Sequence, residues 1–334
     1  MKFTESHASS ERLKAMIVEP RTYRDERDFE AMLELLQAGR LAALGSYYVH
    51  TGDLSWWLFY TEPDANLWQH LYLWEGEGSQ PLLMGWALLS PDWRTFDVFV
   101  HPDLHGSTQA WQIAAWAEAR IAEIVDKFGG KNIRTIWVGE GDTELIAYLE
   151  RSGFTRSADG MLQYRRRLEQ RVGSPPLPPG YYVRRLAGEG EAPLRAAASH
   201  AAFESNMPMP RYLERYLAFM RSPVYRPEMD LVAIAPDGRV AAFCIAWLDF
   251  TNRVGLFEPV GVHPDFRRMG LGKAVLAEGL RRMMAYGMQS AIVCAEADNA
   301  AAQRRYQAAG FQVEQRLLTY VKSLIRPQEL DSRS

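Results

Sequence analysis

The chain has 334 residues, and 38 Lys and Arg stand against 41 Asp and Glu, which gives a formal net charge of -3. Hydrophobic residues make up 47% and charged residues 24%, as in a globular protein with two domains of ordinary size. This balance excludes a strongly basic nucleic-acid-binding protein. No apolar run approaches the roughly 20 residues that are needed to span a bilayer.

In chain order, the first half predicts a polar lead-in over residues 1–15 and then a strand, a helix, two aromatic runs, two strands and a helix, at 16–20, 25–44, 54–60, 67–74, 82–89, 96–100 and 111–124. We interpret the two aromatic runs as strands of the core. An alternative is that Trp56, Trp57, Trp68 and Trp74 line a pocket for a ligand of their own.

A proline-rich linker at 169–180 precedes the second half, and a charged tail at 326–334 follows it. The second half predicts six strands and four helices, at 181–186, 231–235, 240–247, 253–262, 290–297 and 311–324 and at 193–202, 210–221, 271–286 and 299–309. Cys244 and Cys294 lie in strand-like apolar runs and predict small buried thiols. Residues 1–12 lack the apolar core of a signal peptide, so we expect a cytoplasmic protein. No residue spacing predicts a metal site.

A glycine loop joins the strand at 253–262 to the helix at 271–286. Arg267, Gly270 and Gly272 have the spacing R-x-x-G-x-G, and Arg268 and Lys273 add two more cations. Glycines let the backbone approach a ligand, and the first amides of a helix attract an anion. These residues predict a pyrophosphate site. Both a Walker loop and a dinucleotide fingerprint are excluded, because their glycines would stand at other positions.

A second pattern follows the loop at the distance that one known family requires. It reads N-x-x-A-x-x-x-Y-x-x-x-G-F, and its positions are filled by Asn299, Ala302, Tyr306, Gly310 and Phe311. Together the two patterns resemble motif A and the following segment of the GNAT superfamily of acetyl-CoA-dependent N-acyltransferases. The resemblance covers residues 257–311.

The resemblance implies a fold class and a set of site residues. The fold would be α/β (α+β), with a mixed, mostly antiparallel sheet flanked by helices. Acetyl-CoA would be bound as co-substrate by Val260, Gly261, Val262, Arg267, Arg268, Met269, Gly270, Leu271, Gly272, Lys273 and Asn299. Tyr306 would protonate the departing thiolate. Glu258 would act as the general base, although the family's commonest position for that carboxylate is occupied here by Leu256.

An internal repeat indicates two tandem domains of this kind. Residues 98–104 (Val-Phe-Val-His-Pro-Asp-Leu) match residues 260–266 (Val-Gly-Val-His-Pro-Asp-Phe). The first copy has lost both glycines and the cation of the loop, and Leu149 stands where the second has Tyr306. We expect a degenerate N-terminal domain at 16–168 and an active C-terminal domain at 181–325. The two histidines of the repeat, His101 and His263, persist in both copies and are interpreted as structural.

The leading hypothesis is an enzyme that moves the acetyl group of acetyl-CoA to a primary amine of a small molecule, by direct attack in a ternary complex. The tandem arrangement is similar to that of mycothiol synthases, which carry a glutamate where this chain has Leu256. The alternative is a non-catalytic acyl-CoA-binding sensor or scaffold. We expect a monomer or homodimer, and no nucleic-acid or membrane partner. The sequence predicts no particular acceptor, although the helices at about 195–225 would contribute to its site.

Overall fold

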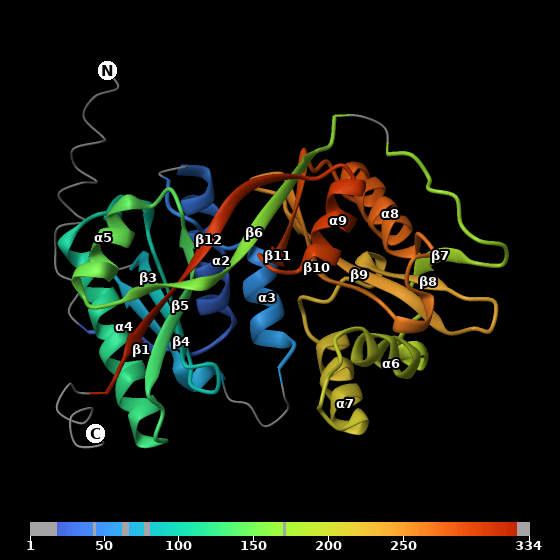
Figure 1. The fold of residues 1–334 in the computed structure, drawn as a ribbon. Helices are drawn as coiled ribbons and strands as arrows, with labels where there is room; N and C mark the ends of the chain where they lie inside the picture. The colour runs from blue at the N-terminus through green and yellow to red at the C-terminus, as the bar shows by residue number, and fades with distance from the viewer. Residues whose placement is uncertain (1–18, 43–44, 62–66, 77–80, 170–171, 326–334) are drawn as a thin grey trace. The chain divides into compact units, whose positions relative to one another are not determined.

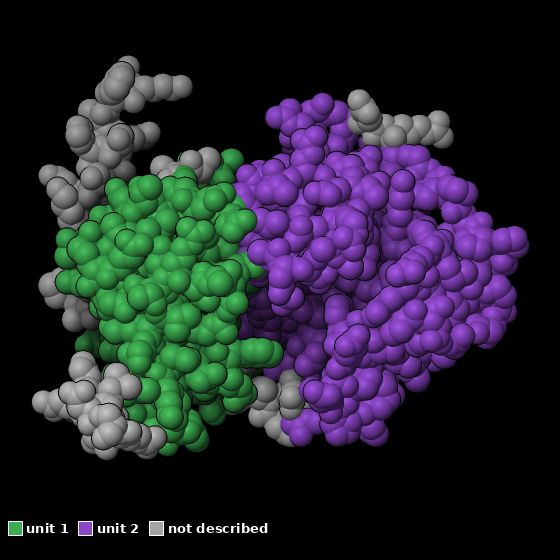
Figure 2. Space-filling model, viewed as in Figure 1, with its two compact units in different colours: residues 1–49, 66–160, 316–334 green, residues 50–65, 161–315 purple. Residues whose placement is uncertain are grey.

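The computed structural model describes residues 19–42, 45–61, 67–76, 81–169 and 172–325. The predicted lead-in, the tail and two residues of the linker lie outside these ranges. The chain divides into two compact units that alternate along the sequence (Figure 2). Unit 1 comprises 1–49, 66–160 and 316–334, and unit 2 comprises 50–65 and 161–315.

The described part of unit 1 contains a mixed sheet with helices packed against it (Figure 1). Its strands, in spatial order, are β1 (Arg21–Thr22), β2 (Leu71–Glu75), β3 (Leu83–Ser90), β4 (Thr95–Val100), β5 (Asn132–Gly139) and the second part of β12 (Gln312–Ser323). Only β4 and β5 pair in parallel among these described strands. The α-helices are α2 (Glu26–Ala42), α4 (Thr108–Lys127) and α5 (Thr143–Arg151), and a short turn, η2 (Pro102–Leu104), precedes α4.

Unit 2 repeats this plan. Its strands, in spatial order, are β6 (Thr155–Arg167, from residue 161), β11 (Ser290–Glu296), β10 (Val254–Val262), β9 (Val240–Asp249), β8 (Asp230–Ile234) and β7 (Tyr182–Arg185). Its helices are α3 (Thr51–Phe59), α6 (Ala192–Ala202), α7 (Met209–Met220), α8 (Leu271–Ala285) and α9 (Ala300–Ala308), and the turn η5 (Pro264–Phe266) precedes α8. Two mixed, mostly antiparallel sheets with flanking helices confirm the predicted fold class.

Both faces of the unit 2 sheet are covered, which explains its continuous apolar strands. All but one residue of β9 are buried, including Cys244. One face packs on α8 through residues such as Phe257, Val275 and Leu280. The other packs on α6 and α7 through residues such as Leu256 and Phe219. The strand β10 is therefore fixed between two cores, and its end is a rigid place for a site.

Each unit contains strand residues that the other half of the chain supplies. Although β12 follows helix α9 of unit 2, its residues Leu317–Ser323 pair with β5 of unit 1. In the same way, Met161–Arg167 of β6 continue from unit 1 and pair with β11 of unit 2. Each unit therefore needs both halves of the sequence to complete its sheet.

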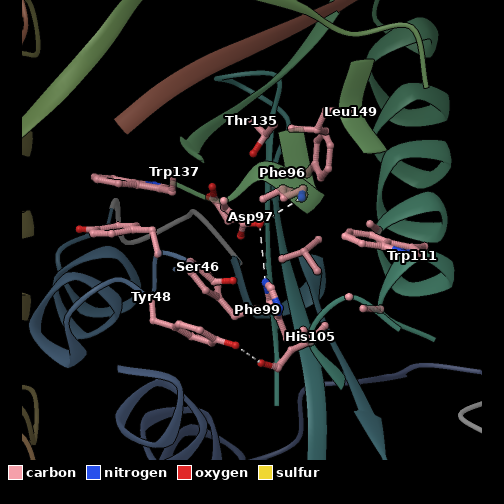
Figure 3. A pocket seen from close by; sticks show the side chains of 18 residues that line it. Ser46, Tyr48, Phe96, Asp97, Phe99, His105, Trp111, Thr135, Trp137 and Leu149 are labelled. Atoms are coloured by element: carbon pink, nitrogen blue, oxygen red, sulfur yellow. Dashed lines mark hydrogen bonds and ion pairs between the residues drawn. The ribbon is translucent and has the colours of Figure 1, made fainter. Parts of the chain in front are cut away.

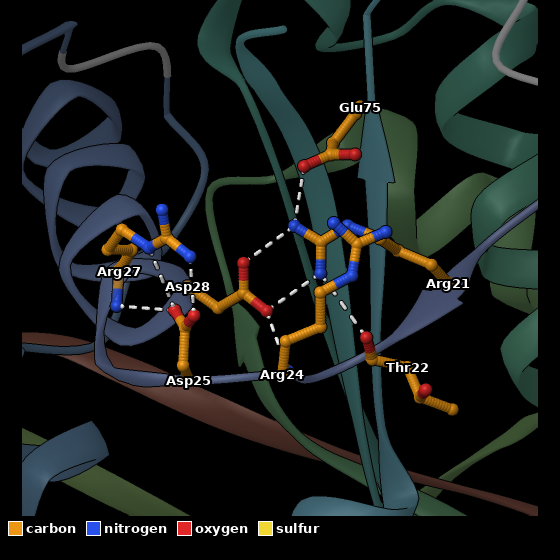
Figure 4. Close-up of polar contacts among 7 residues, drawn as sticks. All are labelled: Arg21, Thr22, Arg24, Asp25, Arg27, Asp28 and Glu75. Atoms are coloured by element: carbon orange, nitrogen blue, oxygen red, sulfur yellow. Dashed lines mark hydrogen bonds and ion pairs between the residues drawn. The ribbon is translucent and has the colours of Figure 1, made fainter.

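Figure 4 shows how the first strand of unit 1 is held in place. The Arg21 guanidinium donates to both carboxylate oxygens of Asp28 on α2, at 2.7 and 2.6 Å, and to Glu75 of β2 at 2.5 Å. This shared pairing raises the pKa of Arg21 and lowers the pKa of Glu75. A bidentate contact of this kind fixes direction as well as distance, so the strand, the helix and the neighbouring strand are tied at one point.

The prediction that residues 54–60 form a strand is wrong, because residues 54–59 belong to α3 and Tyr60 ends it. The α3 rings pack within unit 2, where Trp56 stacks on Tyr60 with centroids 3.8 Å apart and meets Phe219 edge-on at 5.1 Å. In unit 1, Trp74 is buried in the sheet and Trp68 stacks on Tyr23. Trp56 and Trp74 therefore pack in different units, and the alternative of one pocket lined by all four tryptophans stays a prediction.

Candidate active site

Strand β10 has a free edge at its carboxyl end. Among the described residues its parallel ladder to β11 comprises Val254–Leu256 and goes no further. The amide of His263 donates to Ala241 of β9 at 3.0 Å. Since the amides of a strand alternate sides, those of Val260 and Val262 point away from β9, to the edge from which β11 has diverged. Two parallel donors at such an edge can polarise a carbonyl group.

The loop after β10 opens directly into helix α8. Gly270 adopts the left-handed conformation with φ of 79°, and no side chain caps the helix. The first bond of the helix runs from the amide of Ala274 to the Gly270 carbonyl, at 3.1 Å. The three amides before Ala274 thus have no acceptor within the helix, and the helix dipole favours an anion beside them.

Gly272 permits the close approach of this helix to the end of β10. A Cβ atom there would lie 3.0 Å from Val262 Cγ2 and 3.2 Å from Arg305 Cδ. The absence of a side chain keeps the free amides of the helix next to the free edge of the strand. One ligand can therefore place its phosphates at the helix and its reactive carbonyl at the strand.

The predicted cations surround this helix start and are accessible to solvent. Arg267, Arg268 and Lys273 are all exposed, and Arg268 has a φ of 67°. The nearest acid to Arg267 is Glu204, at 3.8 Å. Met269 lies between the arginines and the helix and is partly buried, with the Tyr181 hydroxyl 4.0 Å from its sulfur. Three exposed cations at an uncapped helix suit a pyrophosphate.

Helix α9 positions two of the predicted residues. Asn299 caps the helix, because its Oδ1 accepts from the amide of Ala302 at 3.0 Å. Tyr306 is 5% exposed and its ring lies 5.8 Å from that of Tyr164. Burial raises the pKa of Tyr306, and the nearby Glu258 adds to this effect. The phenol therefore keeps its proton, which is the state that a general acid needs.

Glu258 lies at a bulge of β10 and has an acidic partner. The ladder to β9 shifts between Phe257 and Val260, and the partly exposed Glu258 stands in this interval. Burial of the carboxyl group, followed by the charge and hydrogen bond of Asp53, raises the pKa of Glu258 well above its ordinary value. Two carboxyl groups that share a hydrogen bond hold one proton between them. When ionised, a carboxyl group of raised pKa is a stronger base than an ordinary carboxylate, so it can take a proton from a substrate.

Sequence reasoning missed Asp53, which α3 carries into unit 2. Its carboxylate accepts from the amide of His50 at 2.7 Å, and it is 3% exposed. The His50 ring in turn contacts the Val254 carbonyl of β10, with Nε2 and O 3.0 Å apart. A signal was present in the sequence, since His50 and Asp53 have the spacing of a helix cap. Their pairing with β10 is a long-range contact that no local pattern encodes.

Comparisons with known proteins agree with this geometry. Residues 197–311 match the family model described as "Acetyltransferase (GNAT) family". This segment is therefore similar to a GNAT acetyltransferase domain. It includes β10, the glycine loop, α8 and α9, which are the elements that form most of the candidate site.

The most similar curated relatives include two mycothiol acetyltransferases. The chain is 30% identical to that of Kineococcus radiotolerans over 196 residues, which cover 58% of this chain and 63% of the relative. It is 26% identical to that of Saccharomonospora viridis over 268 residues, which cover 76% and 84%. The first match spans less than two thirds of the relative's length. The chain is therefore similar to acetyltransferases over much of its length.

Two solved structures show the same fold. A GCN5-related N-acetyltransferase from Sphaerobacter thermophilus has a TM-score of 0.64 at 19% identity and covers 92% of this chain and 96% of its own. A tandem GNAT protein from the clavulanic acid biosynthesis pathway has a TM-score of 0.65 at 17% identity, with 92% and 98% covered. The likeness confirms the predicted tandem GNAT fold. Within the described residues, no helix is long and apolar enough to cross a membrane.

Proposed function

We propose that unit 2 transfers the acetyl group of acetyl-CoA to the primary amine of a small molecule, by direct attack in a ternary complex. The observation that supports this most is the position of the uncapped start of α8 beside the unpaired edge of β10. The pyrophosphate would lie against the amides and cations of residues 267–273 and the side chain of Asn299, and the pantetheine arm would lie along Val260–Val262. The site would then bind the acyl donor in an extended form with its carbonyl at the strand.

The side chains supply the proton transfers that the reaction needs. Glu258 accepts a proton from the substrate ammonium, so that the amine nitrogen can attack the acetyl carbonyl. The amides of Val260 and Val262 stabilise the oxyanion that forms as the new C–N bond is made. As the C–S bond breaks, Tyr306 donates its proton to the thiolate, and the phenolate regains a proton as the amide product loses one.

The acceptor would approach from the side of α3. Asp53 is a second carboxyl group beside Glu258, and the negative charge of the pair attracts an ammonium group before the pair takes its proton. Further out, the Arg215 guanidinium lies 4.0 Å from the centroid of Tyr60, so helices α3 and α7 are joined by a cation–π contact. Because the matched relatives are mycothiol acetyltransferases, the acceptor of those proteins is the first amine to test.

The test is a titration of acetyl-CoA into the whole protein, followed by an assay for free thiol with a panel of primary amines. We expect one acetyl-CoA site per chain and thiol release that depends on the amine. If acetyl-CoA did not bind to the protein, the proposed function would be excluded.

A second candidate is an acyl-CoA-binding sensor or scaffold without turnover. The burial of Tyr306 among core residues favours it to some degree, because a phenol that only packs needs no catalytic role. In the same assay a sensor would bind acetyl-CoA and release no thiol with any amine. Turnover that falls when Tyr306 becomes phenylalanine would exclude the sensor.

A further inference from the structure

Unit 1 contains a cavity between its two diverging strands. Strands β4 and β5 pair only at Thr95 and Arg134 among the described residues, and the cavity opens beyond that point. Figure 3 shows the side chains around it, which come from β4, β5, α4, α5 and the segments before α3 and α4. They include Tyr48, Asp97, His105, Trp111, Trp137 and Leu149. Its volume is about 90 Å³. At 10–15 Å³ for each water-sized group, this is room for roughly six to nine such groups.

The cavity corresponds to the acyl-donor site that we propose in unit 2. The amide of His101 donates to Met84 as that of His263 donates to Ala241, so the two turns have the same place in their sheets. Leu149, which lines the cavity, accepts from the amide of Phe154 at 3.0 Å, just as Tyr306 accepts from Phe311. Unit 1 therefore has a cavity at the position where unit 2 would bind the thioester of the acyl donor.

The charge of this space is opposite to that in unit 2. By the repeat, Trp111 stands in the place of Lys273 and His105 in the place of Arg267. Asp142 lies 3.6 Å from the ring of His105. A Cβ atom on Gly106 would lie 2.1 Å from Glu144 Oε2, so a carboxylate covers the turn of the loop. Acidic groups now stand where phosphates would have to lie.

Helix α4 also lacks the free amides of α8. The Ser107 hydroxyl accepts from the amide of Ala110 at 3.2 Å and so caps the helix. Capping satisfies one of the amides that an anion would otherwise bind. An acyl-CoA therefore finds neither the cations nor the open helix end in unit 1, and the cavity calls for a ligand of a different class.

Asp97 is the acidic centre of the cavity. It is 6% exposed, and within the described part of the chain its Oδ1 has no hydrogen-bond partner. Burial raises the pKa of Asp97 to about 7. A carboxyl group in this state gains most from a ligand that brings both a hydrogen-bond donor and a positive charge.

Aromatic rings form the walls around this carboxyl group. The rings of Tyr47 and Trp137 are stacked with centroids 6.0 Å apart, and Trp111 enters from helix α4 (Figure 3). The faces of tryptophan and tyrosine attract cations, and they do so more strongly away from water. We propose that the cavity of unit 1 binds the ammonium head of a small organic amine, with Asp97 as its counter-charge and hydrogen-bond acceptor.

The test uses n-butylammonium chloride as the probe and n-butanol, at the same ionic strength, as its uncharged counterpart. The indole N–H resonances of the ¹⁵N-labelled whole protein report where each probe binds. We expect n-butylammonium to shift the resonances of Trp111 and Trp137, which line the cavity, and to leave that of the exposed Trp93 unchanged. We expect n-butanol to bind at least about tenfold more weakly, because it cannot pair with the carboxylate.

Two variants separate the role of Asp97 from a general effect of charge. Asp97→Asn should lose the preference for the ammonium probe, and Asp126→Asn, which removes an exposed carboxylate of the same unit, should keep it. Equal binding of the two probes to the parent protein, or no movement of the Trp111 and Trp137 resonances, would overturn the proposal. If the Asp97→Asn variant still preferred n-butylammonium to n-butanol, this result would also overturn the proposal.

The pH dependence of n-butylammonium binding to the unsubstituted protein is a further test, and misfolding of a variant cannot affect it. Since the ammonium pairs with the ionised carboxyl group, and the pKa of Asp97 is about 7, affinity should rise about tenfold between pH 6 and pH 8. The other titratable groups at the cavity are His105, Asp142, Glu144 and the two tyrosines, Tyr47 and Tyr48. His105→Gln should retain the rise, and a flat profile would contradict the proposal. Because no acetyl-CoA is used, failure here leaves the function proposed for unit 2 untouched.

Discussion

The two glycine-loop regions of this protein share a scaffold and differ in what they leave open. The turns η2 and η5 are preceded by histidines with almost identical backbone angles, φ −56° and ψ 138° at His101 and φ −55° and ψ 138° at His263. In each turn the ring Nδ1 accepts from the amide two residues later. This agreement supports the structural role predicted for both histidines. The starts of the two helices that follow then differ, because Ser107 caps α4 and Gly270 leaves α8 uncapped.

The difference shows which residues the fold needs and which a ligand needs. Leu149 and Tyr306 occupy the same place, both are buried, and both carbonyls receive the same hydrogen bond. Packing is thus satisfied by leucine as well as by tyrosine. Asp142 and Asn299 likewise both cap the helix that follows. The phenol of Tyr306 and the open start of α8 are then the features of unit 2 that packing does not account for.

The substitution with the largest expected effect on the difference between the two units is a negative charge at the start of α8. Gly270→Asp should weaken acetyl-CoA binding by about a hundredfold or more, because it sets a carboxylate against the pyrophosphate. Calorimetric titration measures the effect. Gly270→Asn is the matched control, since asparagine has the same shape, tolerates the left-handed φ of 79° and carries no charge.

A second control places the same charge in unit 1. By the repeat, Thr108 at the start of the capped helix α4 stands in the place of Gly270, and Thr108→Asp should leave acetyl-CoA affinity unchanged. If Thr108→Asp weakened binding and Gly270→Asp did not, the assignment of the acyl-donor site to unit 2 would be wrong.

Substitution of the proposed base should affect turnover and spare binding. Glu258→Gln should lower kcat by about 10²- to 10⁴-fold, as expected for the loss of a general base. The acidic limb of the pH–rate profile should disappear with it, because Glu258 is the group whose raised pKa sets that limb. Acetyl-CoA affinity, measured in the same titration, should change little. A kcat close to that of the parent protein would assign the base to another group.

Much of this site could be predicted from local sequence. The loop at 267–273, the cap at Asn299 and the repeat of His101 in His263 all follow from patterns within a single strand–loop–helix segment. Each depends on neighbouring residues whose spacing sets the backbone conformation. Most of the strands and helices, and the tandem fold, follow in the same way.

The remaining features depend on contacts between distant segments. The pairing of Asp53 with Glu258 requires α3 to join unit 2, and the aromatic run that contains α3 resembled a buried strand. The bulge of β10 also shifts the repeat. Asp97 stands opposite Leu88, four residues after Met84, and the interval of Glu258 and Pro259 stands opposite Ile245, four residues after Ala241. The offset of the sequence repeat aligns Phe96 with Glu258. The strand pairing instead places Asp97 at the position that corresponds to Glu258.

Loss of the Tyr306 hydroxyl, which Leu149 lacks in unit 1, should have a smaller effect than loss of the base. Tyr306→Phe should lower kcat by about 10- to 100-fold, because a thiolate leaves without much help from an acid. It should not change acetyl-CoA affinity. Leu149→Met is the matched change in unit 1 and should alter neither quantity. If Tyr306→Phe reduced affinity and kcat together, the phenol would act in binding the donor, and its role as acid would be refuted.

The smallest effect should come from Asp53, which acts on Glu258 through charge. Burial is the main cause of the raised pKa of Glu258, and Asp53 adds its charge and hydrogen bond. Asp53→Asn keeps an oxygen to accept from the His50 amide and removes the charge. The acidic limb of the pH–rate profile should therefore move to lower pH, while kcat at the plateau changes by less than about tenfold.

The same substitution should alter how stability depends on pH. A carboxyl group whose pKa is raised by folding stabilises the folded state fully below its unfolded pKa, and this contribution is lost as pH rises through the folded pKa. Because Asp53→Asn lowers the folded pKa of Glu258, less stability is lost on the alkaline side. Urea unfolding at pH 5 and pH 8 should show that the variant gains on the parent as pH rises. A constant difference between them would mean that Asp53 holds α3 in place without affecting the proton on Glu258.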